Sequence, residues 1–242
     1  EVDYRTGAKH DMAATTRLIH DKGALVVWDL AHSTGAFPVD LVGADADFAI
    51  GCGYKYLNGG PGAPAFLWVA PRHQDVMPAI RGWFGHAAPF SFQTGYEPAQ
   101  GITRFVTGTA PILSLSALDA ALDVFDGVDL EAVRQKSVAL CDLMIARADA
   151  RFGGRLQLET TRDGAQRGSQ VSFSFEAGYA MMQALIARGV IGDFRAPNIL
   201  RFGMTPLYTR YVDVFDAVEV MSDLLEDKGY DRPEFHKRAA VT

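Results

Sequence analysis

The chain has 242 residues, of which 48% are hydrophobic, 21% charged and 11% aromatic. These fractions are those of an ordinary globular protein, and they exclude disordered, collagen-like and coiled-coil chains. The net charge of -6 comes without a basic tract. It therefore argues against nucleic acid or an anionic membrane as the main partner, because phosphate binding needs clustered Lys and Arg.

The cysteines and histidines predict neither a disulfide framework nor a metal site. Cys52 and Cys141 lie far apart, outside any CxxC pattern, and the six histidines form no HxH or HExxH pattern. With no long apolar run and no signal peptide, we expect a cytoplasmic protein without a membrane segment. The chain does not begin with Met, and residues 1–4 are typical of the end of a strand, which favours a processed chain or a fragment.

The first half of the chain has the pattern of an α/β layer. A helix is predicted over residues 11–22, with Asp11 placed to cap it and Gly23 placed to end it. Three strands are expected next, over residues 24–29, 47–52 and 65–69. The first is an uninterrupted apolar run, which is typical of a strand buried on both faces of a parallel sheet.

The pattern changes after Pro111 and predicts a small α+β unit with a partly antiparallel sheet. Helices are expected over residues 115–125, 130–152, 178–188 and 212–226, and strands over 156–160, 170–175 and 199–203. The strands at 156 and 170 alternate at period two, as half-buried strands do. A boundary near Gly127 divides the chain into residues 1–126 and 127–242, and the charged tail after Lys228 is expected to be loosely held.

The chemistry is concentrated between residues 29 and 62. Asp29 stands at the carboxyl end of a predicted strand, where ligands bind in open α/β sheets, and its carboxylate suits a protonated ring nitrogen. The alternative is that Asp29 caps the following turn. Lys55 follows another strand, between Tyr54 and Tyr56 and before a glycine-rich loop whose N–H groups suit a phosphate.

A lysine enclosed by aromatics loses its proton more readily and can form an imine, although an isolated lysine of this kind is usually a surface residue. The pairing of Asp29 with Lys55 is more specific than either residue. A ring-nitrogen carboxylate and an imine-forming lysine are the groups that a pyridoxal phosphate (PLP) enzyme supplies.

At four places the sequence resembles the kynureninase family of PLP enzymes. The motifs are DLAHS at residues 29–33, GYKYLN at 53–58, GWFGH at 82–86, and LRF at 200–202 followed by PLY at 206–208. The resemblance extends over nearly the whole chain. It implies the aspartate-aminotransferase-like PLP-transferase fold, with the C-terminal part of the PLP-binding large domain in residues 1–126 and the small C-terminal domain in 127–242.

The resemblance also implies a role for each matched residue. Lys55 would bind the cofactor and move protons, Asp29 would pair with the pyridinium nitrogen, and His32 would lie beside the cofactor. Tyr54 would contact the cofactor phosphate and assist proton transfer. Three residues would serve the phosphate and substrate pocket, Trp83 and Thr109 from the neighbouring subunit and Arg201 as the clamp on the substrate α-carboxylate.

Plainer interpretations of these last three residues stay open. Trp83 suits a core or interface aromatic, and Thr109 suits a helix cap. Arg201 lies on an otherwise apolar strand and needs an anion there, which either a protein carboxylate or the substrate can supply. Gln170 stands where the family more often has His.

The activity that the resemblance implies is hydrolysis of the Cβ–Cγ bond of L-kynurenine to anthranilate and L-alanine, in the kynurenine pathway of tryptophan catabolism and NAD biosynthesis. The preference between kynurenine and 3-hydroxykynurenine stays open. A homodimer with shared active sites is expected, since residues 82–92 are rich in aromatics. The alternatives are another PLP lyase or desulfurase, and a silent truncated chain that acts as a partner subunit.

In the family a long segment precedes the position of Glu1 and supplies further cofactor contacts. If that segment is absent, little activity is expected; if another chain supplies it, activity can be intact. For a desulfurase the two cysteines are poorly placed, because Cys52 lies only three residues before Lys55 and Cys141 lies on a predicted helix.

Overall fold

Two units make up residues 1–238, the part of the chain that the computed structural model describes. Unit 1 comprises Glu1 and residues 11–34 and 39–127. Unit 2 comprises residues 2–10, 35–38 and those from Val128 onward. Two short segments from the first half of the sequence thus belong to unit 2, and no feature of composition marks them. The functional division into a PLP-binding and a small domain stays a prediction.

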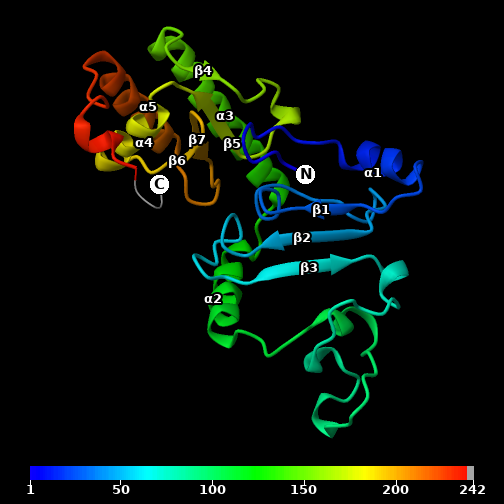
Figure 1. Cartoon of the computed structure of the whole chain (residues 1–242). Helices are drawn as coiled ribbons and strands as arrows, with labels where there is room; N and C mark the ends of the chain where they lie inside the picture. The colour runs from blue at the N-terminus through cyan, green and yellow to red at the C-terminus, as the bar shows by residue number, and fades with distance from the viewer. Residues whose placement is uncertain (239–242) are drawn as a thin grey trace. The chain divides into compact units, whose positions relative to one another are not determined.

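Unit 1 is built around a small mixed sheet. Its regular elements are α1 (Met12–His20), β1 (Val27–Asp29), β2 (Phe48–Cys52), β3 (Ala65–Val69) and α2 (Ile112–Leu122). The strand order is β1-β2-β3, with β1 parallel and β3 antiparallel to β2 (Figure 1). Short 3-10 turns connect these elements at Pro71–His73, Trp83–Gly85, Pro89–Ser91, Gly101–Phe105 and Asp123–Phe125.

The predicted start of unit 1 is partly confirmed. Asp11 caps α1 by accepting a hydrogen bond from the N–H of Ala14 at 2.9 Å. The expectation of a strand at residues 1–4 is wrong, because Val2 makes only an isolated bridge with Lys9 and Tyr4 lies in a turn.

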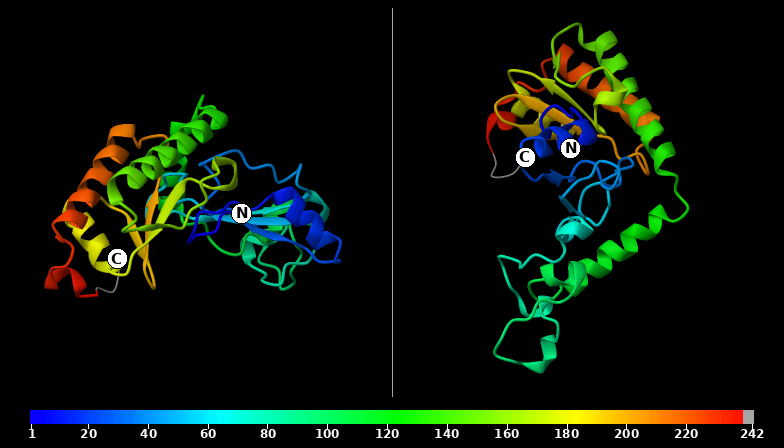
Figure 2. Two further views of the ribbon diagram at one scale, coloured as in Figure 1. Left: turned by 90° about the horizontal axis from the view of Figure 1, so that it is seen from above. Right: turned by 90° about the vertical axis from the view of Figure 1, so that its right-hand side faces the viewer.

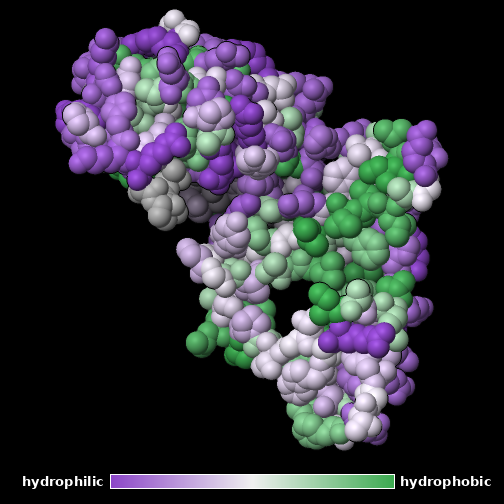
Figure 3. Space-filling view, in the orientation of Figure 1, coloured by the Kyte–Doolittle hydropathy of each residue, from purple (hydrophilic) through white to green (hydrophobic). Residues whose placement is uncertain are grey.

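The two faces of the unit 1 sheet differ in burial. Trp28 and Ala49 face α1 and are buried, and the Trp28 Nε1–H donates to Thr16 Oγ1 at 3.0 Å. On the other face Val27 is 59% and Ile50 44% exposed. The prediction of a strand buried on both faces is therefore wrong for the described residues, and Figure 3 shows hydrophobic residues gathered over these strands.

Unit 2 is a four-stranded sheet with three helices. The helices are α3 (Leu130–Phe152), α4 (Gly178–Ala187) and α5 (Tyr211–Glu226), and the strands are β4 (Gln157–Leu158), β5 (Gln170–Ser174), β6 (Asp193–Arg195) and β7 (Ile199–Gly203). The order is β4-β5-β7-β6 and every pairing is antiparallel, so the expectation of a partly antiparallel sheet is corrected (Figure 1). Figure 2 shows the ribbon in two further views. Two 3-10 turns lie at Gly164–Gln166 and Pro233–His236.

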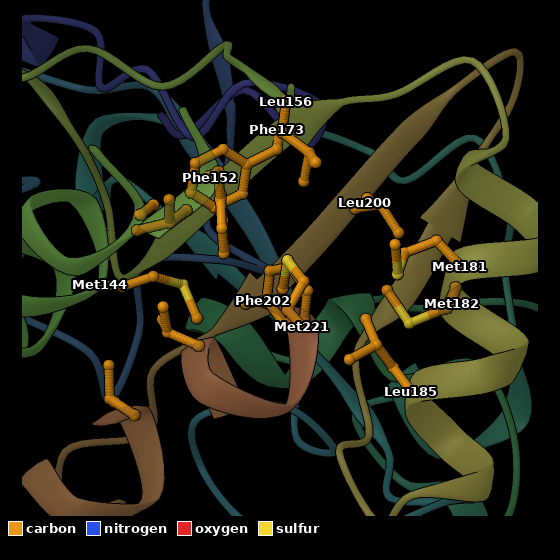
Figure 4. Close-up of a cluster of buried hydrophobic side chains, with 14 of the residues drawn as sticks. Met144, Phe152, Leu156, Phe173, Met181, Met182, Leu185, Leu200, Phe202 and Met221 are labelled. Carbon is orange, nitrogen blue, oxygen red and sulfur yellow. The ribbon is translucent and has the colours of Figure 1, made fainter. Parts of the chain in front are cut away.

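The core of unit 2 lies between this sheet and the helices. Val171 and Phe173 of β5 lie opposite Phe202 and Leu200 of β7, and all four belong to one buried cluster. Helical residues complete the cluster, among them Met144, Met181, Met182, Leu185 and Met221 (Figure 4).

The opposite face of β5 is buried as well. Gln170 is 2% exposed and Ser172 is fully buried, whereas the period-two pattern predicts a half-buried strand. Residues 2–10 lie against this part of the unit: Lys9 N–H donates to the Gln166 carbonyl, and Thr160 Oγ1 donates to the Thr6 carbonyl. The prediction failed because this cover comes from the distant N-terminal end of the sequence.

The segment after Lys228 is better held than expected. Tyr230 and Phe235 pack against the unit 2 core, and the Tyr230 ring lies 5.2 Å from that of Phe175. The prediction of a loose tail is wrong for residues 229–238, while residues 239–242 lie outside the described part. No helix within residues 1–238 is long and apolar enough to span a bilayer.

Candidate active site

The carboxyl ends of β1 and β2 bring Asp29 and the loops that carry His32, Tyr54 and Lys55 to one edge of the unit 1 sheet. Because the two strands are parallel, Asp29 at the end of β1 and Cys52 at the end of β2 lie at the same edge. The Leu30 N–H donates to the Ile50 carbonyl at 2.8 Å, which joins the loop after β1 to β2. Lys55 follows β2 by three residues and is thereby placed beside the loop that carries His32.

Lys55 and His32 are in direct contact. Lys55 Nζ lies 3.2 Å from His32 Nε2, within hydrogen-bonding distance, and 5.4 Å from the centre of the Tyr54 ring. Tyr54 is half exposed, Lys55 is partly buried and Tyr56 is buried in unit 1. The two flanking tyrosines therefore do not enclose Lys55 equally: Tyr54 lies beside the amine, and Tyr56 anchors the backbone.

Only one oxygen of the Asp29 carboxylate accepts a hydrogen bond within the described part of the chain. Its Oδ1 accepts a hydrogen bond from the Ala31 N–H at 2.8 Å, so the turn-capping interpretation of Asp29 is observed. Its Oδ2 accepts no hydrogen bond from any residue in the described part of the chain. The same carboxylate can therefore fix the turn and still present an acceptor oxygen at the sheet edge.

The glycine-rich loop is ordered by its own backbone. The N–H groups of Gly53 and Gly59 donate to the carbonyls of Pro64 and Gly53, both at 2.9 Å, and the Asn58 N–H donates to the Lys55 carbonyl. A Cβ at Gly59 would lie 2.8 Å from the Gly53 carbonyl oxygen. The expectation that the glycines present N–H groups to a phosphate is therefore wrong for Gly59, which is required by close packing.

The segments that carry Trp83 and Thr109 approach each other in another part of unit 1. Gly82 approaches Thr107 so closely that a Cβ would lie 1.6 Å from its carbonyl oxygen, and this contact joins the two segments. Trp83 is 43% exposed, which rules out the core interpretation within this unit. Its ring lies 4.2 Å from that of Phe84 and 5.6 Å from that of Phe90, centre to centre.

Residues 81–96 line an open pocket of about 620 Å³, with Trp83, His86, Phe92 and Tyr96 among the lining residues. Thr109 is exposed and does not cap α2, since Pro111 occupies the N-cap position. The helix-cap interpretation of Thr109 is therefore excluded. Its role in the pocket stays a prediction.

Arg201 lies in unit 2, on β7, and already has a carboxylate partner. Its Nε and Nη2 donate to Asp193 Oδ1 and Oδ2 at 3.1 and 2.7 Å, and its Nη1 donates to the Tyr4 carbonyl at 2.5 Å. Of the two anions left open by the sequence, the structure supplies the protein carboxylate. Asp193 was missed because the three-residue strand β6 is too short to show a pattern.

A second charged cluster that the sequence did not reveal surrounds Asp47 in unit 1. Asp47 is 1% exposed, and its two oxygens accept hydrogen bonds from the Val26 N–H and from Arg72, and lie 2.8 Å from the ring nitrogens of His20 and His73. Burial alone would raise the pKa of this carboxyl. The hydrogen bonds from His20, the Val26 N–H, His73 and Arg72 outweigh burial and hold the pKa well below its usual value.

The thiols are placed as structural residues. Cys141 is fully buried, and burial raises the pKa of its thiol to about 11. Cys52 lies on β2, with its Sγ 3.8 Å from the Ala31 carbonyl oxygen. Across residues 1–238, no group of three or more His, Cys, Asp or Glu side chains is arranged to hold a metal ion.

Comparison with solved structures identifies the fold. An apo cysteine desulfurase from Thermococcus onnurineus superposes with a TM-score of 0.74 at 21% identity, covering 93% of this chain and 58% of that one. A C-DES mutant with glycine covalently linked to its PLP cofactor gives a TM-score of 0.75 at 18% identity, covering 91% and 58%. The expected aminotransferase-like fold, in its C-terminal part, is therefore confirmed.

Sequence comparison is more specific. A family model described as the kynureninase C-terminal domain matches residues 133–221. A curated kynureninase from Burkholderia mallei is 57% identical over 243 aligned residues, which cover 100% of this chain and 58% of that protein. This chain, which thus spans somewhat more than half the length of such relatives, belongs to the kynureninase family.

Proposed function

We propose that the chain forms the C-terminal part of a cytoplasmic, PLP-dependent kynureninase. The reaction consumes L-kynurenine and one water and yields anthranilate and L-alanine, by hydrolysis of the Cβ–Cγ bond. The observation that carries the proposal is the Lys55–His32 contact at the sheet edge where Asp29 ends β1, in a chain 57% identical to a kynureninase.

The donor set at this edge fits PLP. Asp29 offers an oxygen that accepts no hydrogen bond within residues 1–238 and suits a pyridinium N–H, while Lys55 offers an amine for the aldehyde. The polar tip of Tyr54, half exposed beside Lys55, suits the cofactor phosphate. When bound, PLP supplies the electron sink for breaking bonds at the substrate α-carbon and its neighbours.

The residues of the chain then have distinct tasks. Lys55 Nζ accepts and returns the substrate α-proton, and His32 at 3.2 Å orients that amine and shares its proton. The Ala31 N–H fixes one oxygen of Asp29 and thereby orients the carboxylate beside the cofactor ring. Arg201 binds the substrate α-carboxylate through its guanidinium.

We further propose a homodimer in which Trp83 and Thr109 complete the partner's pocket. The support is the exposed aromatic segment at residues 82–92, where Phe90 is 68% and Phe92 84% exposed. Aromatic side chains of this kind are enriched in protein interfaces. Sedimentation of the chain as a monomer at micromolar concentration would contradict the shared pocket.

The test combines two measurements on the whole chain with added PLP. We expect visible absorbance of lysine-bound PLP and fluorescence of anthranilate on adding L-kynurenine, and we expect Lys55→Ala to abolish both. Lys22→Ala, which removes an exposed lysine of the same unit, is the matched control and should leave both unchanged. A PLP band of equal strength in Lys55→Ala would refute the assignment of Lys55.

A further inference from the structure

The guanidinium of Arg201 is held by more hydrogen bonds than a simple ion pair would supply. Asp193 on β6 lies directly opposite Arg201 on β7 in the antiparallel register, so the strand pairing itself sets the distance between the two side chains. Arg201 is 11% exposed at its side chain, and it binds Asp193 through two parallel N–H···O bonds. This arrangement fixes the plane of the guanidinium.

A third contact fixes the other end of the guanidinium. The Tyr4 carbonyl accepts from Arg201 Nη1 at 2.5 Å and from Gln170 Nε2 at 3.1 Å. Gln170 is 2% exposed. Gly7 packs so closely against it that a Cβ on residue 7 would lie 2.8 Å from Gln170 Cγ. The buried amide of Gln170 therefore holds the Tyr4 carbonyl in place, and that carbonyl holds Arg201.

The donors that remain on Arg201 match a carboxylate. A guanidinium has five N–H donors. Within residues 1–238 Asp193 and Tyr4 take three of them, so one N–H remains on Nη1 and one on Nη2. Two donors on neighbouring nitrogens are what a carboxylate needs for a bidentate pair.

The local charge also favours an anion. Asp193 is shared between Arg201 and Arg195, whose Nη2 lies 2.9 Å from Asp193 Oδ2. Two guanidinium groups against one carboxylate leave a net positive charge at the cluster. An incoming carboxylate therefore meets an attractive site, even though Arg201 already has an acidic partner.

We propose that Asp193, together with the Gln170–Tyr4 pair, is the positioning group that aims Arg201 at the α-carboxylate of an amino acid substrate. This inference rests on the proposed function, since it specifies how the carboxylate end of that substrate is held. It assigns positioning roles to three residues that do not touch the substrate, and it gives Gln170 a function in place of the histidine that the resemblance would predict.

The test follows the Nε–H signal of Arg201 by NMR in the 242-residue chain labelled with ¹⁵N-arginine. The signal is assigned by its absence from Arg201→Lys, and L-alanine and L-alaninamide, which lacks the carboxylate, are titrated in turn. We expect L-alanine alone to shift the signal. In Asp193→Asn, we expect L-alanine to bind at least tenfold more weakly, because the amide cannot accept both N–H bonds.

Controls separate positioning from stability. Asp149→Asn removes the carboxylate from another Arg–Asp pair of unit 2, that with Arg162, and should leave L-alanine binding unchanged. Asp193→Glu should restore part of the affinity. In the PLP-loaded chain the KM for L-kynurenine should rise at least tenfold in Asp193→Asn while kcat changes by less than about twofold.

Each contrary outcome identifies what is wrong. L-Alanine binding to Asp193→Asn with wild-type affinity would overturn the positioning role. An Arg201 signal that ignores L-alanine, or responds equally to L-alaninamide, would overturn the carboxylate site itself. Neither result depends on PLP, so failure here is distinguishable from failure of the Lys55 assignment.

Discussion

The buried carboxylate of Asp47 offers a sharp test of the electrostatics of unit 1. In Asp47→Asn one oxygen becomes an NH2 group, so two of the four hydrogen-bond partners around the carboxylate lose their acceptor. Hydrogen bonds to a charged group contribute about 1.5–3 kcal/mol each. Because Arg72 is 42% exposed and regains water, we expect a loss of about 3 kcal/mol in the free energy of unfolding of this unit.

The sign of the pH dependence follows from the lowered pKa of Asp47 in the folded state. A carboxyl with a depressed folded-state pKa contributes stability that is present above its unfolded pKa, about 3.9, and is lost as the pH falls toward the folded value. Asparagine does not titrate. The difference between wild type and Asp47→Asn should therefore shrink below about pH 4, by about 1.4 kcal/mol per pH unit.

Tryptophan fluorescence during urea unfolding is a suitable assay, because all three tryptophans of the chain, Trp28, Trp68 and Trp83, lie in unit 1. Asp75→Asn is the matched control, since Asp75 is 99% exposed and its loss should cost less than about 0.5 kcal/mol. A difference that stays constant from pH 6 to pH 3, or a loss no larger than that of the control, would refute the reasoning.

Three further outcomes are expected. Gly82→Ala should lower the free energy of unfolding of unit 1 by about 2 kcal/mol or more, because the new Cβ would overlap a backbone carbonyl. The control Gly108→Ala, at a position with open space around it, should cost less than about 1 kcal/mol. Tryptophan fluorescence during unfolding measures both. Leu200→Ala should cost about 3 kcal/mol in unit 2, since its side chain is fully buried, and faster amide exchange of β7 would show it. With Ellman's reagent at pH 8, Cys52 should react in the native chain and Cys141 only after unfolding, because burial raises the Cys141 pKa to about 11.

The helical elements were largely predictable because their signals are local. The long helix was predicted over residues 130–152 and is observed at Leu130–Phe152, where Asp129 caps its start and Gly153 ends it in a left-handed conformation. The strand at Ile199–Gly203 was also predicted at its observed bounds. Each of these signals lies within a few residues of the element that it defines.

What the sequence missed depends on residues that are far apart along the chain. The burial of both faces of β5 could not be foreseen, because residues 2–10 cover it. Likewise Arg201 was expected to need an anion, but its pairing with Asp193 depends on a strand of three residues and on its register. The family resemblance placed Lys55 and His32 each at the cofactor, but it did not predict their 3.2 Å contact, which arises from the parallel pairing of β1 with β2.

The cover that residues 2–10 give to unit 2 has a consequence for biosynthesis. The Tyr4 carbonyl meets Gln170 and Arg201 at sequence separations of 166 and 197 residues. At roughly 5–20 residues per second, a ribosome needs on the order of 10–40 s to make the chain between Tyr4 and Arg201. During that interval residues 2–10 have no complete sheet to bind. The sheet of unit 2 can form fully only after β7 has emerged from the ribosome. A shortened chain that begins at Val128 would contain the three helices and the whole sheet of unit 2, but it would leave the polar face of β5 uncovered.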